Sequence, residues 1–144
     1  MKISIGSDHG GLEYKNAIGE HLKELGYEVI DVGTYSSDSC DYPVFGIKAA
    51  TLVANHEVDK GIVVCTTGQG IMMSANKVKG VRCAMGYCDE VVTLTRQHND
   101  ANMLAFGQKF MNLEDVLRRV DLFLQTDFEG GRHERGFNII KDYE

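Results

Sequence analysis

Short apolar runs alternate with amphipathic stretches along this chain, and this alternation restricts its fold more than any other feature. Apolar residues recur at helical spacing between the runs, as at Tyr14, Ile18, Leu22 and Leu25. Parallel strands need crossover connections, which helices supply. The pattern therefore predicts an α/β fold: a doubly wound, Rossmann-like three-layer sandwich with a five-stranded parallel sheet. The expected strands lie at Ile3–Ile5, Val29–Val32, Ile62–Val64, Val81–Ala84 and Met103–Phe106.

Composition limits the size and the partners of the molecule. With 144 residues, 43% of them hydrophobic and 25% charged, we expect one globular domain spanning 1–144. A net charge of −6 argues against a nucleic-acid partner, because phosphate backbones require a basic surface. No apolar stretch approaches the ~20 residues that cross a bilayer, so no membrane partner is expected. Four cysteines without a CxxC pair indicate free thiols and a cytoplasmic protein.

The segment 61–77, GIVVCTTGQGIMMSANK, carries the strongest functional signal. Its apolar run ends in a thiol, Cys65, and a helix-like stretch begins near Ile71. The first N–H groups of a helix have no partner within the helix and bind anions. We therefore expect a nucleophile or a base beside a backbone loop that holds an anion. The residues of this loop after the thiol are Thr66, Thr67, Gly68, Gln69 and Gly70.

The strand order decides which loops meet. Ligands of open parallel sheets bind beyond the carboxyl ends of the strands, at the switch point in strand order. An order of 2-1-3-4-5 makes the first and third strands neighbours, so that Asp8 and His9 converge with Cys65 and Thr67. A carboxylate, an imidazole and a thiol in one crevice can perform acid–base chemistry.

The expected position of His98 predicts that a second chain takes part in the site. His98 follows an expected helix over 87–97, which starts at the carboxyl edge of the sheet and runs back by ~15 Å. His98 should therefore lie near the opposite edge of its own chain, within the polar cluster RQHNDAN at 96–102. A catalytic role for His98 would then complete the site of a neighbour, which predicts a dimer with shared active sites.

Six motifs stand in order along the chain: SDHGG at 7–11, DYP at 41–43, CTTGQGI…ANK at 65–77, RQHNDAN at 96–102, AFG at 105–107 and EGGRH at 129–133. Together they resemble the ribose-5-phosphate isomerase B family, which also includes the two-subunit galactose-6-phosphate isomerases. The resemblance covers nearly the whole chain. It implies a cofactor-free aldose–ketose isomerase that converts ribose 5-phosphate to ribulose 5-phosphate through a cis-enediol. It also implies a homodimer or homotetramer with sites between subunits.

The resemblance also implies a role for individual residues. Cys65 would be the base that moves a proton between C1 and C2, with hydrogen-bond support from Thr67. His98 would be the proton donor that assists opening of the sugar ring. No metal and no cofactor are implied. Substrate contacts would come from Asp8, His9, Thr66, Gly68, Gln69, Gly70, Asn99, Lys109, Arg132 and Arg135.

Three positions depart from the pattern of the family. Thr66 replaces a frequent glycine, and the loop keeps its shape only if Thr66 avoids positive φ. Lys109 stands at an arginine position, where it keeps the charge but loses the bidentate fork. Gly136 stands at a second arginine position, and Arg135 lies one residue earlier, a ~100° rotation on a helix.

Other interpretations stay open at this stage. The changes at Lys109 and Gly136 suggest a hexose 6-phosphate isomerase of the galactose or allose type. A non-catalytic sugar-phosphate-binding protein would keep the same anion site, and a hydrolase would use Cys65 as a nucleophile. We expect the remaining cysteines to be non-catalytic, and His21 and His56 to lie at the surface.

Overall fold

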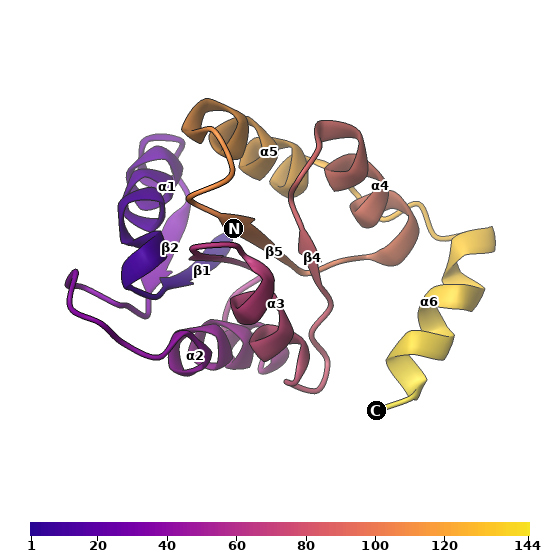
Figure 1. The fold of residues 1–144 in the computed structure, drawn as a ribbon. Helices are drawn as coiled ribbons and strands as arrows, with labels where there is room; N and C mark the ends of the chain where they lie inside the picture. The colour runs from indigo at the N-terminus through magenta and orange to yellow at the C-terminus, as the bar shows by residue number, and fades with distance from the viewer.

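The computed structural model describes residues 1–144 and contains a five-stranded, all-parallel sheet between two layers of helices (Figure 1). The expected α/β sandwich is confirmed. The strands are β1 (Lys2–Ser7), β2 (Glu28–Asp31), β3 (Lys60–Cys65), β4 (Cys83–Met85) and β5 (Met103–Gly107). The helices are α1 (Leu12–Glu24), α2 (Tyr42–Ala54), α3 (Gln69–Asn76), α4 (Asp89–Asn99), α5 (Leu113–Gln125) and α6 (Arg132–Asp142), with a 3-10 turn, η1 (His9–Gly11), before α1.

Each face of the sheet has its own apolar core. Helices α1, α4 and α5 cover one face, where Ile18, Val92 and Phe123 are fully buried. Helices α2 and α3 cover the other face with Ala49 and Ile71. Helices on both faces bury the sheet completely, which explains why the central strands read as continuous apolar runs rather than as alternating ones.

The strand order is β2-β1-β3-β5-β4, so the expected order 2-1-3-4-5 is correct for the first three strands and wrong for the last two. All residues of β5 are buried, whereas in β4 only Cys83 is buried. A strand that is buried on both faces belongs inside a parallel sheet, and a short, partly exposed strand tolerates the edge. The exchange brings the loop after β5 beside the loop after β3.

Helix α6 stands apart from the sandwich, beyond α4 (Figure 1). None of its residues is buried, and Ile139 and Ile140 are exposed. Phe137 provides its main apolar contact, because its ring packs against Phe128 and lies 4.6 Å from the guanidinium of Arg82. No helix in the chain has both the length and the apolar character that crossing a membrane requires.

Candidate active site

The loops after β1 and β3 touch at the carboxyl edge of the sheet. A Cβ atom built on Gly10 would lie 2.1 Å from Oγ1 of Thr66. A Cβ atom on Gly11 would lie 2.4 Å from the carbonyl oxygen of Val64. Both contacts are too close for a side chain, so glycine is required where the two loops meet.

Cys65 is the last residue of β3 and its side chain is buried, with 5% exposure. The N–H of Gly68 donates a hydrogen bond to its Sγ at 3.1 Å. This geometry depends on the left-handed conformation of Gly68, whose φ is +83° and which precedes the first residue of α3. A backbone donor aimed at sulfur suits a negatively charged thiolate.

The first turn of α3 adds backbone donors next to this thiol. The amides of Gly70 and Ile71 make no hydrogen bond, as is usual for the first turn of a helix. The N–H of Gln69 is already bonded to Oγ1 of Thr67 at 3.2 Å. Thr66 keeps a negative φ, so the threonine leaves the shape of the loop intact. The loop can therefore receive an oxyanion.

Asp8 and His9 both have partners of their own in this crevice. Asp8 is buried, and its Oδ1 accepts a hydrogen bond from the N–H of Gly11 at 3.1 Å, which caps η1. His9 is exposed, and its Nδ1 accepts the N–H of Cys40 at 3.3 Å. That bond requires the lone pair on Nδ1, so the ring proton lies on Nε2, where it can be donated to an anion.

Lys109 joins this edge of the sheet because β5, and not β4, pairs with β3. Its N–H donates to the carbonyl oxygen of Thr66 at 3.1 Å, and the N–H of Gln108 donates to that of Cys65 at 2.9 Å. The exposed ammonium of Lys109 thus belongs to the same loop cluster as the thiol. A groove of about 490 Å³ opens beside this cluster, and its lining includes Thr67, Gln69, Met85, Tyr87, Phe110 and Arg119.

His98 lies at the other edge of the sheet. It belongs to the last turn of α4, and the chain then passes through Asn102 into β5. The N–H of Gly61, at the start of β3, donates to the carbonyl oxygen of Asn102 at 3.1 Å. The last turn of α4 therefore lies at the amino ends of the strands, whereas Cys65 lies at a carboxyl end. A single chain does not bring Cys65 and His98 together.

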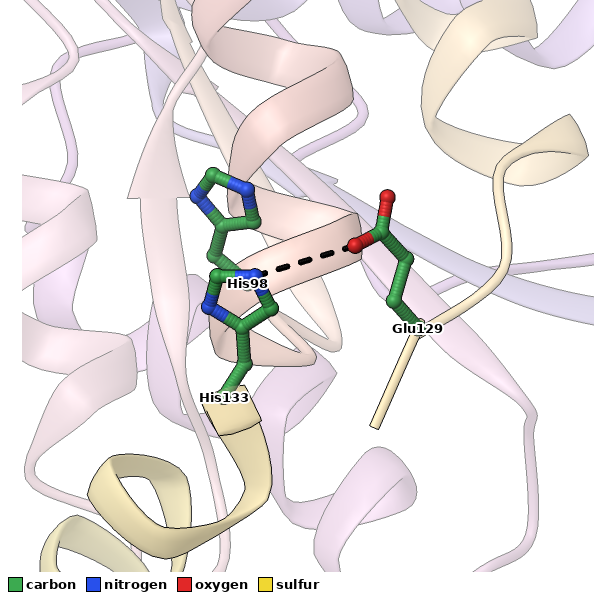
Figure 2. Close-up of side chains that lie close together, drawn as sticks. All are labelled: His98, Glu129 and His133. Carbon is green, nitrogen blue, oxygen red and sulfur yellow. Dashed lines mark ion pairs between the residues drawn. The ribbon is translucent and has the colours of Figure 1, made fainter. Parts of the chain in front are cut away.

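The surroundings of His98 form a second cluster, between α4 and α6. The ring of His98 stacks on that of His133 with 4.0 Å between centroids, and Glu129 lies alongside (Figure 2). Asn99, Arg132 and Arg135 belong to the same two helices and are exposed. The structure therefore divides the expected site residues into two groups at opposite edges of the sheet.

Several contacts within these clusters were not predicted from the sequence. Nothing in the local pattern paired His98 with His133 and Glu129, which are distant in the chain. The ring of Tyr42 packs so closely on Gly70 that a Cβ there would lie 2.6 Å from its Cζ. The DYP motif was the only sequence feature that included this tyrosine, and no role was predicted for it.

The other cysteines and histidines have local explanations. Burial raises the pKa of the Cys83 thiol far above its usual range, so this thiol stays protonated. His56 is exposed, as expected. His21 also lies at the surface, with 24% of its side chain exposed, and its Nε2 lies 2.8 Å from Oδ1 of Asp121, which links α1 to α5.

Known proteins resemble this chain over nearly its full length. A family model described as Ribose/Galactose Isomerase matches residues 3–140. Ribose-5-phosphate isomerase B of Escherichia coli is 46% identical over 145 residues, which cover 99% of this chain and 96% of that protein. A solved ribose-5-phosphate isomerase B of Clostridium thermocellum has a TM-score of 0.97 and 48% identity, covering 99% of this chain and 97% of the other. The enzyme of Mycoplasma genitalium, solved with bound ribulose-5-phosphate, has a TM-score of 0.94 and 42% identity, covering 99% and 95%.

Proposed function

The chain belongs to the ribose/galactose isomerase family, and on that premise we propose that it interconverts ribose 5-phosphate and ribulose 5-phosphate with Cys65 as the base. The observation that carries the proposal is the hydrogen bond of 3.1 Å from the N–H of Gly68 to Sγ of Cys65. It places the sulfur beside the unpaired amides of Gly70 and Ile71. A base and an oxyanion site next to each other are what the isomerisation of an aldose requires.

The proposed chemistry is a proton transfer along the open-chain sugar. The Cys65 thiolate takes the proton from C2 of ribose 5-phosphate, and the electron pair moves toward the aldehyde oxygen to form a cis-enediolate. The amides of the α3 turn stabilise the negative charge on that oxygen. The hydroxyl proton of O2 passes to O1, and the thiol returns the abstracted proton to C1, which gives the ketose. Thr67, whose hydroxyl is exposed at the turn, supports the base and the substrate.

A complete site requires two chains. His98 lies at the amino edge of the sheet and Cys65 at the carboxyl edge. His98 therefore completes an active site that contains the thiol of a partner chain, in a homodimer or a homotetramer. There it gives a proton to the ring oxygen as the furanose opens. Asn99 accompanies His98 at the end of α4 and contacts the substrate from the same chain.

The phosphate would be held by cations and N–H groups from both clusters. His9 and Lys109 come from the edge that carries Cys65, and Arg132 and Arg135 come from α6 of the partner. Neither arginine has an ion pair within its own chain, so both guanidinium groups are available to an anion. Asp8, Gln69 and the backbone of Thr66 complete the contacts to the sugar. A cytoplasmic location, expected from the free thiols, stays a prediction.

The proposed base is tested by Cys65→Ser. We expect its turnover of ribose 5-phosphate to fall by about 10²- to 10⁴-fold, the usual contribution of a general base. Exchange of the C2 proton with deuterated water should disappear in NMR spectra, while calorimetry should still detect binding of ribose 5-phosphate. The matched control is Cys88→Ser, because Cys88 is the N-cap of α4, where serine is a favourable residue. Undiminished proton exchange in Cys65→Ser would exclude this thiol as the base.

The sugar itself is tested by a panel of aldose phosphates. A Cβ at Gly136 would have no neighbour within 4 Å, so an open position stands where the family resemblance led us to expect a phosphate-binding arginine. A higher kcat/KM for galactose 6-phosphate or allose 6-phosphate than for ribose 5-phosphate would establish a hexose 6-phosphate isomerase instead. Unchanged sugars after long incubation would establish a binding protein.

A further inference from the structure

Three potential metal ligands converge at the end of α4. His98 comes from that helix, His133 from the first turn of α6, and Glu129 from the loop between α5 and α6 (Figure 2). Their ligand atoms all lie within 4.8 Å of one another. The closest ionic contact is 3.7 Å, between Nε2 of His133 and Oε2 of Glu129.

The backbone holds these three residues together. The N–H of Glu129 donates to the carbonyl oxygen of Gln97 at 3.1 Å, which fixes the loop directly beside His98. Gly130 and Gly131 then adopt positive φ values of 68° and 56°, so the chain can turn back and start α6. The ring of His133 thereby stacks on the ring of His98, with an angle of 18° between the two planes. A backbone hydrogen bond and a ring stack therefore both hold the cluster together.

The donor set selects a class of metal. Two imidazoles and one carboxylate suit Zn²⁺ and neighbouring transition metals, whereas Mg²⁺ and Ca²⁺ prefer all-oxygen sites. In a tetrahedral zinc site with bonds near 2.1 Å, neighbouring donors lie about 3.4 Å apart. Because the present separations extend to 4.8 Å, binding requires the ligands to move toward one another, and the side chain of Glu129 is exposed.

We propose that His98, Glu129 and His133 form a binding site for Zn²⁺ that inhibits the enzyme, with water as the fourth ligand. The ion occupies the lone pair of His98, so this ring can no longer become the imidazolium that donates a proton to the sugar. Binding of the ion is independent of the proposed function, whereas the inhibition rests on the role given there to His98.

Binding is tested first, without reference to activity. In competition with a chromophoric zinc chelator, the parent protein should bind one Zn²⁺ per chain and no Mg²⁺. Glu129→Gln and His133→Gln each remove one ligand and should weaken zinc binding by more than about tenfold. The matched control is Glu134→Gln, which changes the same charge on an exposed neighbour outside the cluster and should bind as the parent does.

Cysteines are the competing explanation for bound zinc. Cys65→Ser should retain the zinc affinity of the parent. Loss of the zinc in Cys65→Ser, together with parental affinity in Glu129→Gln, would move the site to the thiol and overturn the proposal.

Inhibition is tested next with the active enzyme. Zn²⁺ should stop turnover and a chelator should restore it. Glu129→Gln should keep the metal-free rate but need at least about tenfold more Zn²⁺ for half-inhibition. Equal zinc sensitivity in Glu129→Gln and the parent would contradict the proposal. Tight binding without any inhibition would retain the metal site and instead reject the catalytic role of His98.

Discussion

At the scale of single residues, the surroundings of the proposed base, Cys65, depend on one backbone conformation. Gly68 turns its N–H toward Sγ of Cys65 because its φ is positive, a region that side chains avoid. There is also no room for a side chain, since a Cβ would lie 2.9 Å from Sδ of Met85 and from the carbonyl carbon of Phe106. The glycine therefore serves the geometry of the thiol and the packing of the sheet edge together.

Gly68→Ala should damage both properties. Strain in the left-handed region alone costs about 1–2 kcal/mol of unfolding free energy, and the contact with the backbone of Phe106 adds to it. We expect turnover to fall about 100-fold, the usual effect of removing one donor from an anion site. The matched control is Gly26→Ala, at a φ of +90° with no neighbour within 4 Å, which carries the strain without the clash. Urea unfolding and steady-state kinetics measure the two effects, and equal losses in both variants would refute this account of Gly68.

At the scale of helices, a charged network ties α4 to α5. Asp89, in the first turn of α4, accepts a hydrogen bond from Nε of Arg118 at 2.8 Å and another from Nε of Arg119 at 2.9 Å. These bonds, first from Arg118 and then from Arg119, lower the pKa of Asp89 from 3.8 to about 2. A negative charge at a helix N-terminus is favourable in itself. The α4–α5 contact bears on the proposed function because α4 carries His98.

Stability should therefore depend on pH through Asp89. A depressed pKa means that the folded state favours the ionised form, so the contribution is complete above about pH 4 and is lost as pH falls to about 2. Asp89→Asn should be less stable than the parent at pH 7, and the difference should shrink over that window. Urea midpoints at several pH values measure it. Glu90→Gln, an exposed neighbour without an ion pair, should show no such trend, and a difference for Asp89→Asn that stays constant with pH would disprove the assignment.

At the scale of the whole molecule, the local pattern located all five strands, whereas the expected order was correct only for the first three. The periodicity of apolar residues identified all five strands, because burial leaves a direct mark on composition. The positions of β4 and β5 depend on contacts between distant segments, which a local pattern does not record. Helix starts were also displaced: α3 begins at Gln69 rather than Ile71, since the loop glycine Gly68 provides the turn.

The residues proposed for the active site were also only partly predictable from the sequence. Cys65 and its glycine loop could be recognised from spacing, because a strand end and a helix start define one place in the fold. The surroundings of His98 could not, because Glu129 and His133 reach it only through two left-handed glycines and the packing of α6 on α4. Lys109 lies beside the thiol only because β5, rather than β4 as expected, is the neighbour of β3.

The separation of Cys65 and His98 makes a prediction about the assembly. If each site combines the thiol of one chain with the imidazole of another, Cys65→Ala and His98→Ala are each inactive alone. Unfolding and refolding an equal mixture produces mixed dimers, in each of which one site carries both lesions and the other carries none. Half of the dimers are mixed, so about one quarter of the parental activity should return. Refolding each variant alone is the control. A mixture that stays as inactive as its components would show that the two residues do not share a site across chains.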